Sequence, residues 1–189
     1  MDTKYYELHV TVTPEKVLEF ADFCKHTGAK PLYIQLDDGL HRNQPMCAVT
    51  NMLPNDAAGR VWAKDYERII SSHFTVTRTK LESRLTEGPN EYYEAHWKLD
   101  LRRNEHFWSC ALASLVKLHP QLHRSLNLLN TRVHYLSQRI YSTNDPIAAS
   151  DQFSASGETI KGYYGLPLVK THYERCVWDS NPALDYGWA

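Results

Sequence analysis

Polar and apolar side chains alternate in two stretches of the chain that open with the same residues. Tyr-Tyr-Glu-x-His begins at Tyr5 and again at Tyr92, and the alternation continues to Val12 and Leu99. A period of two predicts a β-strand with one polar face and one buried face. The faces expected to be buried comprise Tyr6, Leu8, Val10 and Val12 in the first stretch and Tyr93, Ala95, Trp97 and Leu99 in the second.

A glutamate and a histidine share the polar face of each predicted strand. Glu7 and His9 lie on the first strand, and Glu94 and His96 lie on the second, with Lys98 two positions further on. Because residues two apart on a strand point the same way, each pair addresses one place. The two pairs indicate a candidate site.

The remaining stretches repeat one order of elements. A helix is predicted to begin after a Thr13 cap, with Pro14 in its first turn, and to stop at Gly28. Turn residues and periodicity then predict strands over 31–36 and 46–50, a helix over 55–70 and a strand over 73–82. The second half is predicted to contain a strand over 92–101, a helix over 104–118, a strand over 133–141, a weak helix between Asp145 and Gly162, and a strand over 169–178. The polar segment 119–127 is expected to be a loop with a short helical turn.

The order β-α-β-β-α-β followed by a second, similar series predicts an α+β fold. We expect tandem duplicated ferredoxin-like repeats, packed as one globule with a central polar cleft. The first repeat would span residues 1–85 and the second 91–189, separated by the segment 85–90 with its Gly88-Pro89. The second repeat includes a C-terminal tail, whose Trp188 is expected to fold back onto the body.

Neighbouring strands follow from this topology. The first and last strands of each repeat would pair, which places Arg78, Lys80 and Glu82 beside Glu7 and His9. In the second repeat, Arg175 and Asp179 would lie beside Glu94 and His96. The polar faces of both sheets, left uncovered by the helices, would then meet in the cleft.

Composition and charge exclude several classes of protein. Hydrophobic residues make up 42% of the chain and charged residues 23%, which is typical of a globular protein rather than a disordered one. The net charge of −1 argues against general coating of nucleic acid, which requires strong basicity. No apolar run is long enough to span a bilayer, and no signal peptide is visible. The four scattered cysteines favour reduced thiols, so a cytoplasmic location is expected.

Two His-x-Thr motifs suggest a reaction. His9 with Thr11 and His73 with Thr75 could hold a phosphodiester between two imidazoles, one acting as general base and the other as general acid. The threonine hydroxyls and Arg78 would then contact the phosphoryl oxygens. These motifs resemble the paired signature of the two-histidine phosphoesterase superfamily. The resemblance implies a metal-independent phosphodiesterase, a hydrolase that acts on a nucleotide or small phosphorylated ligand without a cofactor.

Other functions are compatible with the same residues. The charged side chains of the expected cleft could bind a nucleotide or another anion without catalysis, or could form a salt-bridge network with no ligand. The candidate ligand-binding residues are Glu7, Lys80, Glu94, His96, Lys98 and Arg175.

A metal-dependent enzyme is the third alternative. The two Glu-x-His strands could supply nitrogen and oxygen ligands from Glu7, His9, Glu94 and His96. Such paired modules are similar to the vicinal-oxygen-chelate enzymes. The Tyr-Tyr-Glu-x-His strands and the aromatic tail also resemble an uncharacterised family of duplicated proteins, which implies a duplication and no particular activity. The sequence does not indicate the oligomeric state.

Overall fold

The computed structural model describes residues 3–101, 105–130, 133–163 and 165–187. Their elements, in chain order, are β1 (Lys4–Val12), η1 (Pro14–Lys16), α1 (Val17–His26), β2 (Lys30–Leu36), β3 (Asn43–Leu53), α2 (Asp56–Ser71), β4 (Val76–Arg84), β5 (Tyr92–Asp100), α3 (Glu105–Leu118), β6 (His123–Asn127), β7 (Val133–Ile140), α4 (Pro146–Gly162), β8 (Leu168–Asp179) and η2 (Pro182–Asp185). Most predicted elements lie within a few residues of these bounds. Asn104 and Trp188 lie outside the described residues.

The strands form one closed barrel in the order β1-β3-β2-β6-β7-β5-β8-β4, and every neighbouring pair in it is antiparallel. The prediction of two ferredoxin-like repeats packed around a cleft is therefore wrong. Residues 34–36 of β2 pair with 125–127 of β6, and residues 80–84 of β4 pair with 174–179 of β8. The pairings β2–β6 and β4–β8 provide hydrogen-bond partners for backbone N–H and C=O groups that would be unpaired at the edges of two separate sheets.

Strand β6 explains why the sequence did not predict closure. His123–Asn127 is polar and short, and the expected loop with a helical turn is wrong for this segment. It becomes a strand because β2 and β7 offer hydrogen-bonding partners on both sides. Tertiary pairing thus outweighs the weak local preference for strand structure.

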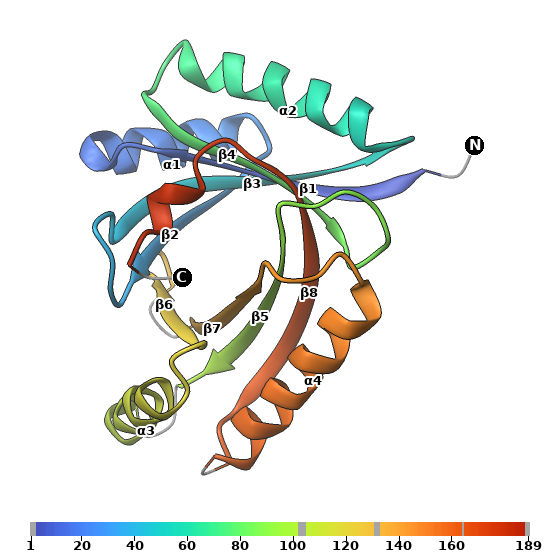
Figure 1. Ribbon diagram of the computed structural model, residues 1–189. Helices are drawn as coiled ribbons and strands as arrows, with labels where there is room; N and C mark the ends of the chain where they lie inside the picture. The colour runs from blue at the N-terminus through green and yellow to red at the C-terminus, as the bar shows by residue number, and fades with distance from the viewer. Residues whose placement is uncertain (1–2, 102–104, 131–132, 164, 188–189) are drawn as a thin grey trace.

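The helices lie on the outside of the barrel, α1 and α2 over one half and α3 and α4 over the other (Figure 1). Two hydrophobic cores fill the space beneath them. One core holds the apolar face of β1 against α1 and α2, and the other holds the apolar face of β5 against α3 and α4. The prediction that these two apolar faces are buried is confirmed. Because the outer surface takes the apolar side chains, strict alternation turns the polar ones into the barrel.

The C-terminal tail returns to the barrel after β8. The segment η2 carries Leu184 and Asp185, which are both buried, and crosses toward β2 (Figure 1). The backbone N–H of Leu40 donates to the carbonyl of Tyr186 at 3.4 Å. None of the helices among the described residues has the length and apolar character needed to cross a membrane.

Candidate ligand cavity inside the barrel

The barrel encloses a cavity of about 330 Å³. Every strand contributes side chains to its wall, so the cavity is the interior of the barrel. The lining residues are Tyr5, Glu7, His9, Thr11, Lys30, Leu32, Ile34, Leu36, Gln44, Met46, Arg78, Lys80, Glu94, His96, Ser125, Tyr135, Ser137, Arg139, Lys170, His172, Glu174 and Asp185. An eight-stranded barrel is wide enough to hold one small ligand.

The cavity wall has two chemically different sides. Leu32, Ile34 and Leu36 of β2, with Met46 of β3, form an apolar side. The other side, formed mainly by β1, β4, β5, β7 and β8, carries the glutamates, the histidines and the interior arginine and lysine side chains.

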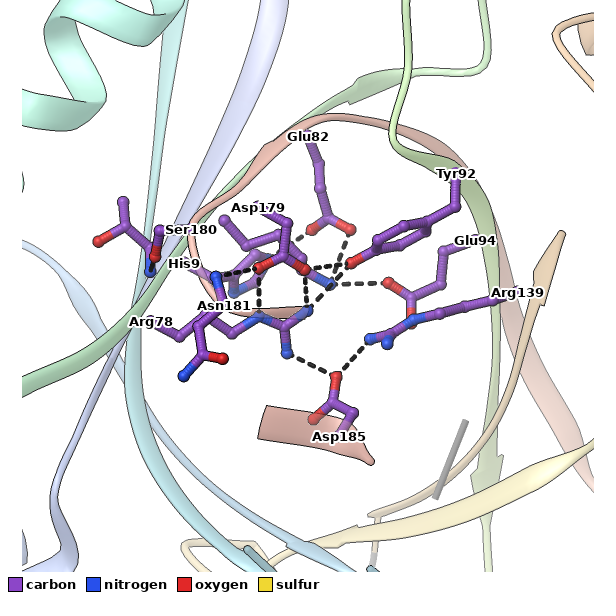
Figure 2. A network of polar contacts seen from close by, with 12 residues as sticks. His9, Arg78, Glu82, Tyr92, Glu94, Arg139, Asp179, Ser180, Asn181 and Asp185 are labelled. Carbon is purple, nitrogen blue, oxygen red and sulfur yellow. Dashed lines mark hydrogen bonds and ion pairs between the residues drawn. The ribbon is translucent and has the colours of Figure 1, made fainter. Parts of the chain in front are cut away.

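Buried ion pairs fill the end of the barrel next to η2 (Figure 2). Arg78 donates from Nε to Asp179 Oδ1 at 2.9 Å and from Nη1 to Asp185 Oδ2 at 2.6 Å. Its Nη2 contacts Asp179 Oδ2 and the Tyr92 hydroxyl, which in turn donates to Asp179 at 2.7 Å. Asp185 also accepts hydrogen bonds from Arg139 and Gln44. These arginines outweigh the cost of burial and hold the pKa of Asp185 at about 2.

The network continues onto the charged wall. Arg139 Nε donates to Glu94 Oε1 at 2.9 Å, and Lys80 Nζ donates to Glu94 Oε2 at 2.7 Å. Lys80 also lies 2.9 Å from Glu82 Oε1, and His9 Nε2 lies 3.1 Å from Glu82 Oε2. Signs alternate from Asp179 to Glu82, which is the arrangement that makes buried charges tolerable.

Four glutamates form a row across the adjacent strands β1, β4, β8 and β5. Glu7 pairs with Glu82, and Glu94 pairs with Glu174, as direct cross-strand neighbours. We call these four residues the glutamate belt. Carboxylates directly opposite one another on a sheet repel, so the belt requires positive charge nearby. Lys80 and Arg139 compensate Glu82 and Glu94, which leaves Glu7 and Glu174 without a permanent cation among the described residues.

Glu174 is the least compensated member of the belt. Its ion pair within the described chain is with His96, at 3.8 Å between Oε2 and Nε2. Burial, together with repulsion by Glu82, raises the pKa of Glu174 to about 8. For His96, burial opposes protonation, but attraction by Glu94 outweighs it and raises the pKa above its ordinary value. Ser137 Oγ lies 2.7 Å from His96 Nδ1 and orients the ring.

Glu174→Gln is expected to stabilise the ligand-free protein at alkaline pH. A carboxyl whose pKa is raised in the folded state favours folding below its unfolded pKa of about 4.5, and this contribution is lost as pH rises to about 8. At pH 8.5 the variant should therefore exceed the wild type in free energy of unfolding by roughly 4–5 kcal/mol, because one pKa unit corresponds to about 1.4 kcal/mol. At pH 4.5 the difference should vanish. Urea unfolding at both values measures it, with the exposed Glu158→Gln as control. Equal stability at pH 8.5 would show that Glu174 is not desolvated.

The candidate phosphodiesterase site is not assembled, and the prediction of that function is wrong. His9 and Thr11 line the cavity, but His73 and Thr75 precede β4 in the turn after α2. The ring of His73 packs against Phe23, with centroids 5.2 Å apart, on the outer side of the sheet. The reason is that β4 begins only at Val76, so the second motif is not on a strand. The two imidazoles cannot act on one phosphodiester.

Two other candidate residues have a structural role. Each guanidinium nitrogen of Arg78 is engaged by Asp179, Asp185 or Tyr92, so none remains to stabilise a phosphoryl group. Arg175 was expected in the cleft beside Glu94, but it points out of the barrel. There it is fully buried and donates to Asp56 at 2.8 and 2.9 Å.

A β-bulge explains the error at Arg175. Leu81 pairs with Trp178, whereas Glu82 pairs with Cys176, so β8 carries one extra residue at this point. The bulge reverses which face successive residues present. Asp179 and Glu174 therefore both point inward, and Arg175 points outward.

The remaining ligand-binding candidates are mostly brought together. Glu7, Lys80, Glu94 and His96 line the cavity, while Lys98 lies outside the set of described lining residues. Sequence reasoning missed Glu174, His172, Arg139 and Asp185 as interior residues. A signal was present for two of them. His172-x-Glu174 is a third pair of histidine and glutamate two positions apart in a predicted strand, in reverse order.

Comparison with known proteins assigns no family to the chain. No family model matches, and no curated protein matches. Among solved structures, a proposed monooxygenase from Lactobacillus acidophilus has a TM-score of 0.31 at 11% identity, covering 93% of each chain. A proposed monooxygenase from Fusobacterium nucleatum has a TM-score of 0.38 at 11% identity, covering 100% of this chain and 96% of the other. A heme-binding protein from Thermus thermophilus has a TM-score of 0.31 at 8% identity, covering 92% of this chain and 91% of the other. None of the three is described as a phosphodiesterase, and similarities of this size carry no argument about function.

Proposed function

We propose that the protein binds a small amphipathic molecule inside the barrel. The cavity supports this proposal because one side of its wall is apolar and the other is densely polar. Its volume of about 330 Å³ lies at the lower end of the range for small-molecule sites. An apolar body would rest on Leu32, Ile34, Leu36 and Met46, and a polar head group would face the glutamates and histidines.

The energetic cost of the interior supports a binding role. An eight-stranded barrel can fill its centre with apolar side chains, which add stability. This interior instead holds carboxylates directly opposite one another and a cavity between the two sides. Proteins retain such destabilising arrangements chiefly where function requires them.

Met46→Trp should block the cavity. 2-Phenylethanol is a suitable probe because it has a small apolar body and a neutral polar head. We expect the wild type to bind it with a dissociation constant on the order of 1 mM. The tryptophan side chain would occupy the apolar side, so the variant should bind at least tenfold more weakly. Titration of the ¹⁵N-labelled protein followed by NMR measures both values and shows which residues respond.

Val61→Trp is the matched control, because it introduces the same side chain on α2, outside the barrel, at a position that is 61% exposed. It should bind 2-phenylethanol like the wild type. Unchanged binding by Met46→Trp, or NMR shifts confined to residues outside the cavity, would contradict the proposal.

A further inference from the structure

We infer that the ligand of the barrel carries a cationic head group, such as a protonated amine, which binds between Glu174 and Glu7 of the glutamate belt. This inference rests on the proposed function and adds the chemical class of the ligand. It follows from the charge balance of the barrel interior, from the two belt glutamates that face the cavity, and from the position of the apolar wall.

Among the described residues, the barrel interior contains more carboxylates than permanent cations. The carboxylates are Glu7, Glu82, Glu94, Glu174, Asp179 and Asp185, and the interior cations that pair with them are Arg78, Lys80 and Arg139. The network from Asp179 to Glu82 uses all three cations. Lys30 and Lys170 also line the cavity but are exposed, so solvent and salt screen their charges. A cationic ligand would supply charge that the residues described in the structure do not supply.

The buried carboxylate of Glu82 is held by ion pairs with Lys80 and His9. Glu82 is fully buried, and among the described residues neither of its carboxylate oxygens accepts a hydrogen bond. Its contacts with Lys80 and His9 are ion pairs without hydrogen-bond geometry. One oxygen of Glu82, one of Glu174 and a ring nitrogen of His96 lie within 4.8 Å of one another. Figure 2 shows the Glu82 carboxylate directed toward the polar network. An ammonium group provides three donors, which suits the carboxylates of Glu174 and Glu7, the two belt members that line the cavity without a permanent cation among the described residues.

A divalent metal is the rival occupant of Glu82, His96 and Glu174. An organic cation fits better for two reasons. The ammonium of Lys80 lies 2.9 Å from Glu82 and would repel a metal at that carboxylate. Glu82 also lies behind the lining of the cavity, whereas Glu7 and Glu174 face it. An amine head can reach these two glutamates while its body stays on the apolar side, near the rings of Tyr5 and Tyr135.

Three probes with one aromatic body and different heads test this inference. They are phenethylamine, 2-phenylethanol and phenylacetate, titrated at pH 8.5 in the presence of a chelator. At this pH Glu174 is mostly ionised, and an alkyl amine remains mostly protonated. We expect phenethylamine to bind at least tenfold more tightly than 2-phenylethanol and phenylacetate not to bind. Glu174→Gln should reduce the advantage of the amine over 2-phenylethanol to less than threefold.

Glu158→Gln removes the same charge from an exposed position on α4 and should leave the amine preference unchanged. Equal affinities of the wild type for the amine and the alcohol would overturn the inference and leave the proposed function standing. If none of the three probes binds, the proposed function itself fails. A separate titration with Zn²⁺ or Mn²⁺, without chelator, tests whether a divalent metal occupies the site instead. Stoichiometric metal binding that Glu174→Gln abolishes, together with loss of the amine preference on metal loading, would assign the belt to a metal.

Discussion

Replacing Arg78 with methionine is expected to lower the free energy of unfolding by about 3–5 kcal/mol, the usual loss when one partner of a buried ion pair is removed. Arg78 is only 4% exposed, and its guanidinium is bonded to Asp179, Asp185 and Tyr92. Methionine fills a similar volume but leaves both carboxylates without their principal cation. Urea unfolding measures the loss through the shift of the midpoint at constant slope.

The control for Arg78 is Arg68→Met on α2. Arg68 pairs with Asp65 at 3.0 Å, but both side chains are more than half exposed. Surface pairs of this kind contribute about 0.5 kcal/mol or less, so the control should unfold like the wild type. A loss below 1 kcal/mol in Arg78→Met would show that the buried network does not hold η2 to the barrel. The free energy of unfolding of Arg78→Lys should fall between those of Arg78→Met and the Arg68→Met control, because a lysine keeps the charge but cannot bond two oxygens of one carboxylate as a guanidinium does.

Replacing Arg175 with methionine is expected to cost about 2–4 kcal/mol. This side chain joins α2 to the loop between β4 and β5, since it donates to Asp56, to Ser83 Oγ at 3.1 Å and to the carbonyl of Pro89 at 2.8 Å. The loop is built around it. Gly88 has φ of 138°, and a Cβ there would lie 2.5 Å from Arg175 Nη1. The cost should be smaller than at Arg78, because Asp56 is 26% exposed and can recover hydrogen bonds from water.

The same variant separates a structural role from a ligand-binding one. If Arg175 is structural, its methionine variant should unfold at lower urea but, while folded, should bind 2-phenylethanol and phenethylamine like the wild type. Loss of binding without loss of stability would instead return Arg175 to the candidate site. Asp56→Asn serves as the control on the partner. In the wild type the Tyr6 hydroxyl donates to Asp56 at 2.7 Å, and an asparagine oxygen can still accept that hydrogen bond. Asp56→Asn should therefore destabilise the protein less than Arg175→Met.

Three basic residues show that the sequence identifies charged candidates for a site more readily than it assigns their roles. Arg78, Lys80 and Arg175 all lie in predicted strands near Glu-x-His pairs, and each was a candidate for the site. Their roles depend on which face they occupy and on what lies opposite. Residue patterns give the face only until a bulge shifts the alternation, as it does in β8.

The sequence by itself determined the two apolar strand faces, the positions of most helices and strands, and the gathering of Glu7, His9, Glu94 and His96 on polar faces. These features depend on a periodicity that local geometry imposes on each strand and helix. Only the tertiary structure decided that the strands close into one barrel, because β6 acquires its structure from β2 and β7. It alone also placed His73 outside and Glu174, Arg139 and Asp185 inside. Strand closure, a bulge and the return of the tail join residues far apart in the chain, and no local pattern records those contacts.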